Sequence, residues 1–297
     1  MTLSRALPPA LVAIAIAFTA PLAHSQTLRK IAETERITVG YRESSIPFSY
    51  LISPNKPVGF AVEITEAIVE DVRKRTGKRD LKVVYMPVTG QNRIPLLIDG
   101  SYDLECGSTT NTAARGKEVA FAISHFYAGT RLLTGRTSGV LGFADLAGKS
   151  VSTVGGSTNE KVLRQYVDDR KLNVKILAAK DYAETLQHLE GGRATAVALD
   201  DILLYGLRAS SDTPESLTIV GETLQVDPYG CMLRRDDAEF KQLVDATIAR
   251  LMRSGEFAKL YSKWFESPIP PKGINLQMPM SSQLQANLRD LSDKPAQ

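Results

Sequence analysis

Three stretches near the N-terminus decide the fold: ITVGY (residues 37–41), AVEITEAIVEDV (residues 61–72) and KVVYMPV (residues 82–88). The first and third are short β-branched runs of the kind that form buried strands. In the middle stretch apolar residues recur every three or four positions, which predicts a helix with one face packed on a sheet. A strand, a helix and a second strand in this order indicate a parallel sheet covered by helices.

The same alternation continues along the chain, so we expect an α/β protein throughout. Further β-branched runs predict strands at residues 151–154, 174–177, 196–199 and 217–220. A helix is expected from Phe240 to Met252, with Asp236 as its N-cap and Glu239 completing a capping box. A second helix is expected from Phe257 to Phe265 before prolines end it. The residues after Pro279 form a polar tail without a clear pattern.

The first 25 residues have the three parts of a secretory signal peptide. Arg5 precedes an apolar run over residues 10–20, and Ala23 and Ser25 supply small residues before Gln26. The run is far shorter than the roughly 20 apolar residues that span a bilayer. We therefore expect cleavage near Ser25/Gln26 and export to the periplasm, with a single membrane anchor as the alternative.

The charge balance argues against a nucleic-acid partner. The chain has 36 Lys+Arg against 33 Asp+Glu, and the signal segment contains only Arg5 among these. Nucleic-acid binding proteins usually carry a basic stripe or a strong positive charge. We therefore expect no nucleic-acid partner, and no metal or other cofactor, because no ligand cluster with metal-binding spacing is present.

Cys106 and Cys231 are the only two cysteines of the chain. Export would place them in a compartment where disulfides persist, so we expect a Cys106–Cys231 bridge. The alternative is two buried free thiols.

Several motifs in a fixed order give the chain a family resemblance. They are VGYRESSIPFSY (39–50), QNRIPLLIDGSYDLECGSTTN (91–111), DLAGKSV (145–151), YGCMLRRDDAEF (229–240), YSKWF (261–265) and IPPKGINL (269–276). With them the chain resembles the periplasmic polar amino-acid-binding proteins of ABC transporters, and most of all the glutamate/aspartate-binding branch. The resemblance runs from about Leu28 to Leu276.

The resemblance implies a two-lobed type II periplasmic-binding-protein fold. Each lobe would be a mainly parallel sheet flanked by helices, with crossing strands near residues 126–131 and 226–229 as the hinge. The expected division is a signal peptide at 1–25, lobe 1 at 26–127, lobe 2 at 128–226, and the rest of lobe 1 with the tail at 227–297. The protein is expected to act as a monomer that delivers its ligand to an ABC transporter permease.

By resemblance, nine residues form the ligand site between the lobes. Arg115, with Ser108, Thr110 and Thr158, would hold the α-carboxylate, Asp200 would receive the α-ammonium, and Arg42 and Arg93 would hold a side-chain carboxylate. Arginine suits this task because its planar cation donates two parallel hydrogen bonds to one carboxylate. Two positions depart from the family pattern: Gly90 replaces an expected serine, and Tyr182 replaces an expected histidine. Both lie at the side-chain end of the site.

Three alternatives to an acidic-amino-acid carrier remain at this point. The altered side-chain end could favour a neutral ligand such as glutamine. A dehydratase-like enzyme could use the same scaffold, since a fold does not fix a function. A sensory role would need a separate membrane partner. Against the enzyme, His125 and His188 fall outside the matched site, and we expect His125 to be structural and His188 to lie on the surface.

Overall fold

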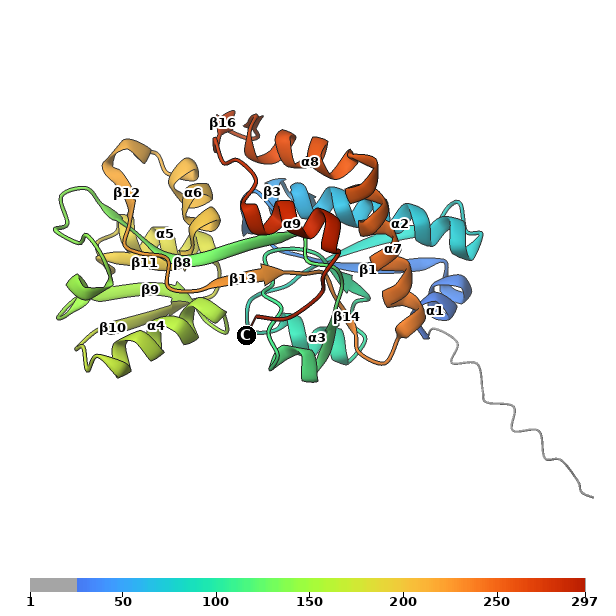
Figure 1. Ribbon diagram of the computed structural model, residues 1–297, viewed down its shortest axis with the longest axis horizontal. Coiled ribbons are helices and arrows are strands. Elements are labelled where there is room, and N and C mark those ends of the chain that lie inside the picture. Colours follow the sequence, from blue (N-terminus) through green and yellow to red (C-terminus); the bar gives the residue numbers. More distant parts are fainter. Residues whose placement is uncertain (1–25, 297) are drawn as a thin grey trace, which may run out of the picture.

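Residues 26–296 are the part of the chain that the computed structural model describes, and they form two α/β lobes joined by paired strands (Figure 1). The predicted signal segment, residues 1–25, lies outside the described residues. All six strands that the sequence predicts are present, which confirms the α/β class. Among residues 26–296, no helix combines the length and apolarity that crossing a membrane requires.

The first lobe is built on a five-stranded sheet in the order β5-β1-β6-β14-β7. Strand β1 is parallel to β5 and β6, whereas β14 is antiparallel to β6 and β7. The strands are β1 (Arg36–Tyr41), β5 (Lys82–Pro87), β6 (Leu104–Glu105), β7 (Val119–Phe121) and β14 (Met232–Arg234). Because β14 follows the second crossing, the first lobe is discontinuous in sequence, as the resemblance implies.

Helices and two small sheets surround this first sheet. The helices are α1 (Gln26–Thr34), α2 (Phe60–Thr76), α3 (Arg93–Ile98), the 3₁₀ turn η1 (Arg115–Lys117), α7 (Ala238–Ser254), α8 (Glu256–Phe265) and α9 (Ser282–Asp290). The small sheets comprise β2 (Ser44–Ser45), β3 (Ser49–Ser53) and β4 (Lys56–Val58), and β15 (Pro268–Ile269) with β16 (Ile274–Asn275).

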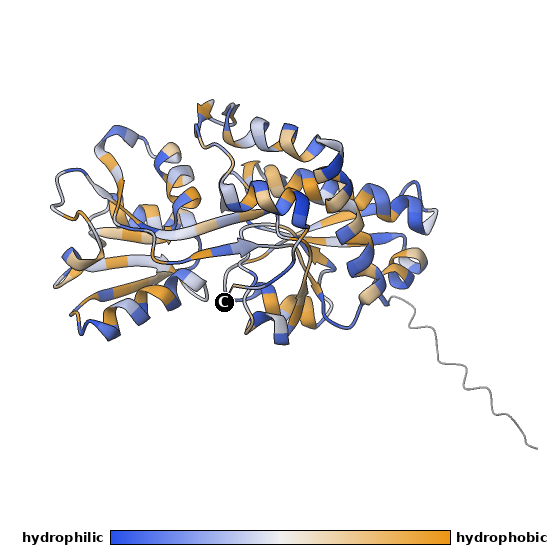
Figure 2. Cartoon of the chain, viewed as in Figure 1, coloured by the Kyte–Doolittle hydropathy of each residue, from blue (hydrophilic) through white to orange (hydrophobic). Residues whose placement is uncertain are grey.

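The second lobe is built on a six-stranded sheet in the order β10-β9-β11-β8-β12, with β13 also paired to β8. The strands are β8 (Phe126–Gly135), β9 (Ser150–Val154), β10 (Lys175–Ala179), β11 (Ala196–Asp200), β12 (Leu217–Val220) and β13 (Val226–Tyr229). The helical elements are η2 (Phe143–Leu146), α4 (Thr158–Asp169), α5 (Tyr182–Glu190), α6 (Asp201–Ser210) and η3 (Pro214–Ser216). Figure 2 shows hydrophobic residues along its strands and hydrophilic turns on the outer side of α4.

The two crossing strands are anchored in an aromatic cluster of the first lobe. Strands β8 and β13 pair antiparallel, with Phe126 opposite Tyr229 at the end nearest this lobe. The Phe48 ring packs edge-on against both, with centroids 4.9 and 5.3 Å away, and Phe265 stacks on Phe126 at 5.1 Å. Because these rings are buried and interlocked, they hold this end of the two crossing strands against the first lobe.

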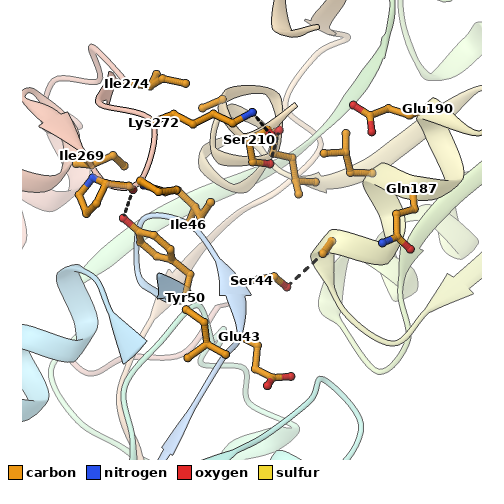
Figure 3. A pocket seen from close by; sticks show the side chains of 17 residues that line it. Glu43, Ser44, Ile46, Tyr50, Gln187, Glu190, Ser210, Ile269, Lys272 and Ile274 are labelled. Carbon is orange, nitrogen blue, oxygen red and sulfur yellow. Dashed lines mark hydrogen bonds between the residues drawn. The ribbon is translucent and has the colours of Figure 1, made fainter. Parts of the chain in front are cut away.

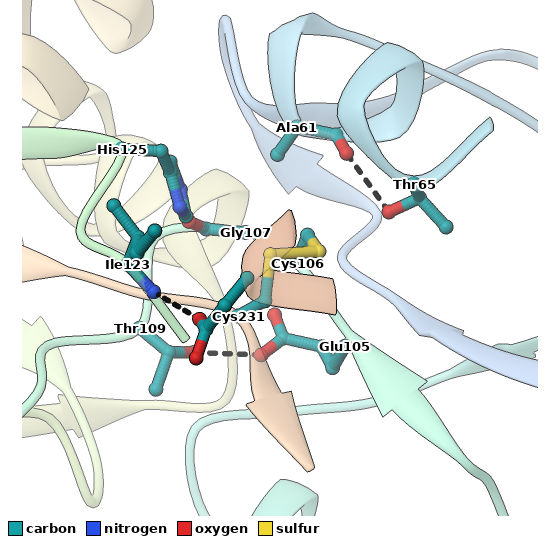
Figure 4. The surroundings of a disulfide bond; sticks show 10 residues. Ala61, Thr65, Glu105, Cys106, Gly107, Thr109, Ile123, His125 and Cys231 are labelled. Atoms are coloured by element: carbon teal, nitrogen blue, oxygen red, sulfur yellow. Dashed lines mark hydrogen bonds between the residues drawn. A yellow bond between two sulfur atoms is a disulfide. The ribbon is translucent and has the colours of Figure 1, made fainter. Parts of the chain in front are cut away.

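The Cys106–Cys231 disulfide predicted from the sequence is present. Cys106 follows β6 and Cys231 precedes β14, so the bond joins the ends of two neighbouring strands of the first sheet. Figure 4 shows it among buried residues of that lobe. The covalent loop of 125 residues therefore contains the whole second sheet.

Three local expectations are wrong. The side chain of Asp237, not Asp236, accepts the hydrogen bond from the Phe240 amide that caps α7. The polar tail, in which no clear pattern was expected, contains helix α9, which buries Leu284 and Asn287 and packs against α7 of the first lobe. His188 is buried and does not lie on the surface. Helix α5 turns its side chain toward Ser152 on β9, and the His188 Nδ1 atom lies 2.9 Å from the Ser152 hydroxyl.

Candidate functional site

The predicted site residues share one structural origin: almost every one follows the carboxyl end of a strand. Arg42 follows β1, Arg93 begins α3 after β5, and Ser108 and Thr110 follow β6. In the second lobe, Thr158 begins α4 after β9, Tyr182 begins α5 after β10, and Asp200 ends β11. Open α/β sheets bind ligands at this edge because loops and helix N-termini converge there. Only Arg115, in η1, lies further along its connection.

Arg42 and Arg93 form a buried cationic pair in the first lobe, each 2% exposed. Arg93 Nη1 donates to Thr109 Oγ1 at 2.8 Å, while the guanidinium of Arg42 lies over the Tyr182 ring at 5.0 Å. Burial and the neighbouring charge of Arg42 lower the pKa of Arg93. Within residues 26–296, Arg42 Nη1 and Arg93 Nε are buried without a hydrogen-bond partner. The pair therefore has donors left for an anion.

Arg115 connects the two lobes. Its Nη1 donates to the Thr110 carbonyl at 2.9 Å and its Nη2 to the Gly156 carbonyl of the second lobe at 3.1 Å. Beside it, the hydroxyls of Thr110 and Thr158 lie 3.0 Å apart across the same gap. Burial of the guanidinium, and to a lesser extent Arg93, lower the pKa of Arg115 to about 9, so it remains cationic at neutral pH.

Asp200 is the buried anion that the second lobe contributes. It is 6% exposed, and its carboxylate accepts hydrogen bonds from Asn159 Nδ2 at 2.6 Å and from the Tyr229 hydroxyl. Burial raises the pKa of Asp200 to about 6, although these two hydrogen bonds oppose the shift. A buried carboxylate in this setting favours a cationic partner, since pairing would offset the cost of its desolvation.

The two departures from the family pattern have a structural basis. A Cβ on Gly90 would lie 2.6 Å from the Gly155 carbonyl of the opposite lobe, so this contact leaves no space for a side chain. Gly156 has a φ of +74° and faces Gly90 in return. Tyr182 directs its hydroxyl to Ser108 at 3.0 Å and its ring to Arg42. The tyrosine therefore contributes an aromatic face to the arginine pair.

Sequence reasoning missed five residues that support this site. Their common feature is a short hydrogen bond to a predicted site residue or its immediate partner; they are Ser45, Glu105, Thr109, Asn159 and Tyr229. Glu105 and Thr109 lie inside the quoted LECGSTTN segment, which was the available signal. Nothing in the sequence pattern identified Asn159, whose role depends on where α4 meets β11.

The two histidines lie outside this constellation. His125 is fully buried, its Nε2 lies 3.0 Å from the Gly107 carbonyl, and burial lowers its pKa to about 4. It is therefore neutral under ordinary conditions. Within residues 26–296, no group of three or more His, Cys, Asp or Glu side chains is placed to hold a metal ion.

A separate cavity of about 350 Å³ also lies between the lobes, bordered by β2, β3, α5, α6 and the β15–β16 hairpin (Figure 3). Its walls are mainly apolar, and none of the nine predicted residues lines it. Lys272 crosses its rim and donates to the Ser210 and Ser211 carbonyls at 2.9 Å. The arginine cluster differs from this cavity in that it combines buried cations, a buried anion and unpaired donors.

Comparison with known proteins shows which family the chain belongs to. Residues 37–267 match the model of the bacterial extracellular solute-binding proteins, family 3. The chain is 44% identical to the glutamate/aspartate import solute-binding protein of Escherichia coli K12, over 96% of this chain and 97% of the relative. It is 46% identical to the L-glutamate/L-aspartate-binding protein of Pseudomonas aeruginosa, over 91% and 90%.

A solved structure of an ancestral arginine-binding protein bound to glutamine aligns with a TM-score of 0.69 and 27% identity, over 78% of this chain and 98% of that one. The two sequence relatives are solute-binding proteins, not enzymes, and the solved structure shares the fold of this chain. The protein therefore belongs to the bacterial extracellular solute-binding proteins, family 3.

Proposed function

We propose that this protein captures glutamate or aspartate outside the cytoplasmic membrane and delivers it to an ABC transporter permease. The observation that carries the proposal is the charge set of the site. Three arginines converge with one carboxylate, Asp200, at facing strand ends of two lobes. An acidic amino acid presents the complementary groups, two carboxylates and one ammonium. The names of the relatives that match over more than nine-tenths of the chain support the same ligand class.

Each end of the ligand has an assigned partner in this proposal. Arg115, Ser108, Thr110 and Thr158 hold the α-carboxylate, and Asp200 receives the ammonium. Arg42 and Arg93 hold the side-chain carboxylate, with Tyr182 and the backbone at Gly90 shaping that end. Bidentate arginine–carboxylate pairing supplies both affinity and orientation.

The lobes are proposed to hinge about β8 and β13 and to close when a ligand contacts both. Thr110–Thr158 and Ser108–Tyr182 are hydroxyl pairs that join the lobes beside the site. A ligand that bridges the same elements binds the closed arrangement better and thereby shifts the population toward it. The proposal also includes the lobe boundaries, at 127/128 and 226/227, and signal cleavage near Ser25/Gln26. It further includes a periplasmic location and a monomeric state.

Calorimetry over a panel of amino acids tests the ligand class. We expect glutamate and aspartate to bind at least about 100-fold more tightly than glutamine and asparagine, because a neutral side chain would leave the buried arginine pair without charge-assisted hydrogen bonds. Arginine and lysine serve as negative controls. A neutral amino acid that binds far more tightly than both acidic ones would overturn the acidic assignment in favour of a glutamine-type carrier.

Acidification is expected to weaken ligand binding through Asp200. Its pKa of about 6 means that below this pH the carboxylate is increasingly protonated and cannot pair with the ligand ammonium. The dissociation constant should be level between about pH 7 and 8 and rise up to about tenfold per pH unit below pH 6. The ligand side-chain carboxylate titrates near pH 4 and stays ionised over most of that range.

The same group has the opposite effect on the ligand-free protein. Because its folded-state pKa is raised above the unfolded value of about 3.9, Asp200 contributes stability below that value, and this stability is lost as the pH rises through 6.

The Asp200→Asn variant tests the effect on binding. It should bind the ligand weakly, with a dissociation constant that does not change between pH 5 and 7. A variant that keeps the wild-type pH dependence would show that another group causes it.

A further inference from the structure

Glu105 is a second buried carboxylate near the site, and the ligand scheme above does not use it. It ends β6, is fully buried and lies next to the disulfide-bonded Cys106 (Figure 4). Its Oε2 accepts a hydrogen bond from Thr109 Oγ1 at 2.9 Å. Within residues 26–296, its Oε1 is buried without a hydrogen-bond partner. An anion this poorly solvated is costly unless nearby cations compensate it.

Those cations are Arg42 and Arg93. Thr109 Oγ1, which donates to Glu105, accepts from Arg93 Nη1 at 2.8 Å, so one hydroxyl links the two charges. Arg42 also lies beside Gly107. A Cβ on Gly107 would be 2.4 Å from Glu105 Oε1 and 3.7 Å from Arg42 Cγ, so the carboxylate and the arginine stem both lie close to the same face of this glycine.

The charge balance gives this arrangement a consequence for selectivity. Arg42, Arg93 and Arg115 bring three positive charges, whereas Asp200 and Glu105 bring two negative ones. An acidic amino acid carries one net negative charge, so its binding would bring the total charge of these five side chains and the ligand to zero. A neutral amino acid would leave one buried positive charge uncompensated, which costs more in a dry cleft than in water.

We propose that Glu105 is the resident counter-ion of Arg42 and Arg93 and, through Thr109, a positioning residue that limits how strongly the site prefers acidic over neutral amino acids. This inference rests on the proposed function. Without ligand, Glu105 partly compensates the buried arginines. With ligand, it repels the side-chain carboxylate held by the same arginines, which weakens binding and favours release.

Glu105→Gln tests the charge while keeping the shape and an oxygen for Thr109. Two effects of opposite sign are expected. The ligand-free variant should melt several degrees lower, because two buried arginines lose their counter-ion. Its glutamate-to-glutamine affinity ratio should rise about five- to tenfold, because a repulsive charge is removed. A lower melting temperature with an unchanged or reduced ratio would assign Glu105 a merely structural role and overturn the proposal.

Asp103→Asn is the matched control. Asp103 is also fully buried and lies two residues away, but it pairs with Lys30 at 2.6 Å and Arg234 at 3.0 Å, neither of which belongs to the predicted site. The Asp103→Asn variant should have a lower melting temperature and an unchanged glutamate-to-glutamine affinity ratio. An equal rise in the ratio for this variant would show that the effect is not specific to Glu105.

Thr109→Val tests the link if Glu105→Gln does not fold. This variant removes the hydroxyl that Arg93 and Glu105 share while keeping both charges. The glutamate-to-glutamine affinity ratio should fall about tenfold, because Arg93 would lose the contact that positions it. A ratio within twofold of wild type would refute the positioning role. Wild-type protein that binds no acidic amino acid would refute the proposed function itself, whereas tight wild-type binding with unaltered variants would refute only the role of Glu105.

Discussion

Replacing Arg115 by alanine is expected to abolish measurable binding of glutamate and aspartate. Arg115 is placed to hold the α-carboxylate, and its guanidinium already spans the lobes from the Thr110 carbonyl to the Gly156 carbonyl. Its loss would leave a desolvated carboxylate without its main cation and remove a contact that favours closure. Loss of a charge-assisted bidentate pair at a buried site corresponds to a fall of about 1,000-fold or more in affinity.

Arg136→Ala is the control for this experiment. Arg136 is an exposed arginine of the second lobe whose Nε donates to the Glu215 carbonyl at 2.7 Å, away from the site, so affinity should stay within about twofold of wild type. Small-angle scattering adds a second measurement. Saturating glutamate should compact the wild type and the control but leave Arg115→Ala unchanged. Near-native affinity in Arg115→Ala would refute its assigned role.

The position of the predicted site residues at one edge of each sheet has a physical reason. Arg42, Arg93, Thr158 and Asp200 all lie just after strand-like runs, and parallel strands bring their carboxyl ends to one edge of a sheet. Periodicity therefore predicted the strands, whereas the site residues and their assignment to the two lobes came from the family resemblance. Neither could give the distances, because those depend on how the two lobes close.

The elements that sequence reasoning missed are short or depend on distant partners. Strands β6 and β14 have only two and three residues, too few for an alternating pattern to emerge. Helix α9 is polar on most of its surface and gains stability from Asn287, whose side-chain amide donates to the Ser124 carbonyl at 2.7 Å. His188 was misplaced because its buried partner, Ser152, is 36 residues away in the chain.

Gly90 illustrates a different limit. From the sequence it was a missing hydroxyl at the side-chain end of the site. In the folded protein it is a point of close approach, where the Gly155 carbonyl of the other lobe occupies the position of a side chain. A residue can thus depart from a family pattern for a reason that only the contact between lobes reveals.

Removing the disulfide by replacing both Cys106 and Cys231 with alanine is expected to lower the melting temperature of the mature protein by about 10 °C or more. The bond closes a loop of 125 residues, and constraining so long a loop in the unfolded chain corresponds to about 4–5 kcal/mol in the chain-entropy model. In a protein of this size, 1 kcal/mol shifts the melting temperature by roughly 2–4 °C. Alanine is preferred to serine because both positions are buried and a hydroxyl there would add its own cost.

Ligand affinity well below the melting temperature should change little, by about threefold at most, because other contacts hold the same segments together. Gly230 N donates to the Thr109 carbonyl at 3.1 Å, and Asn111 N donates to the Pro228 carbonyl at 2.8 Å. These two hydrogen bonds join residues 109–111 to residues 228–230. Each single alanine variant should lose as much stability as the double variant, since either one breaks the bond. Thiol reductant should lower the melting temperature of the wild type alone. If the double variant has the same melting temperature as the wild type, closing the loop between Cys106 and Cys231 does not stabilise the protein. The backbone hydrogen bonds between residues 109–111 and 228–230 would then be enough to hold these segments together.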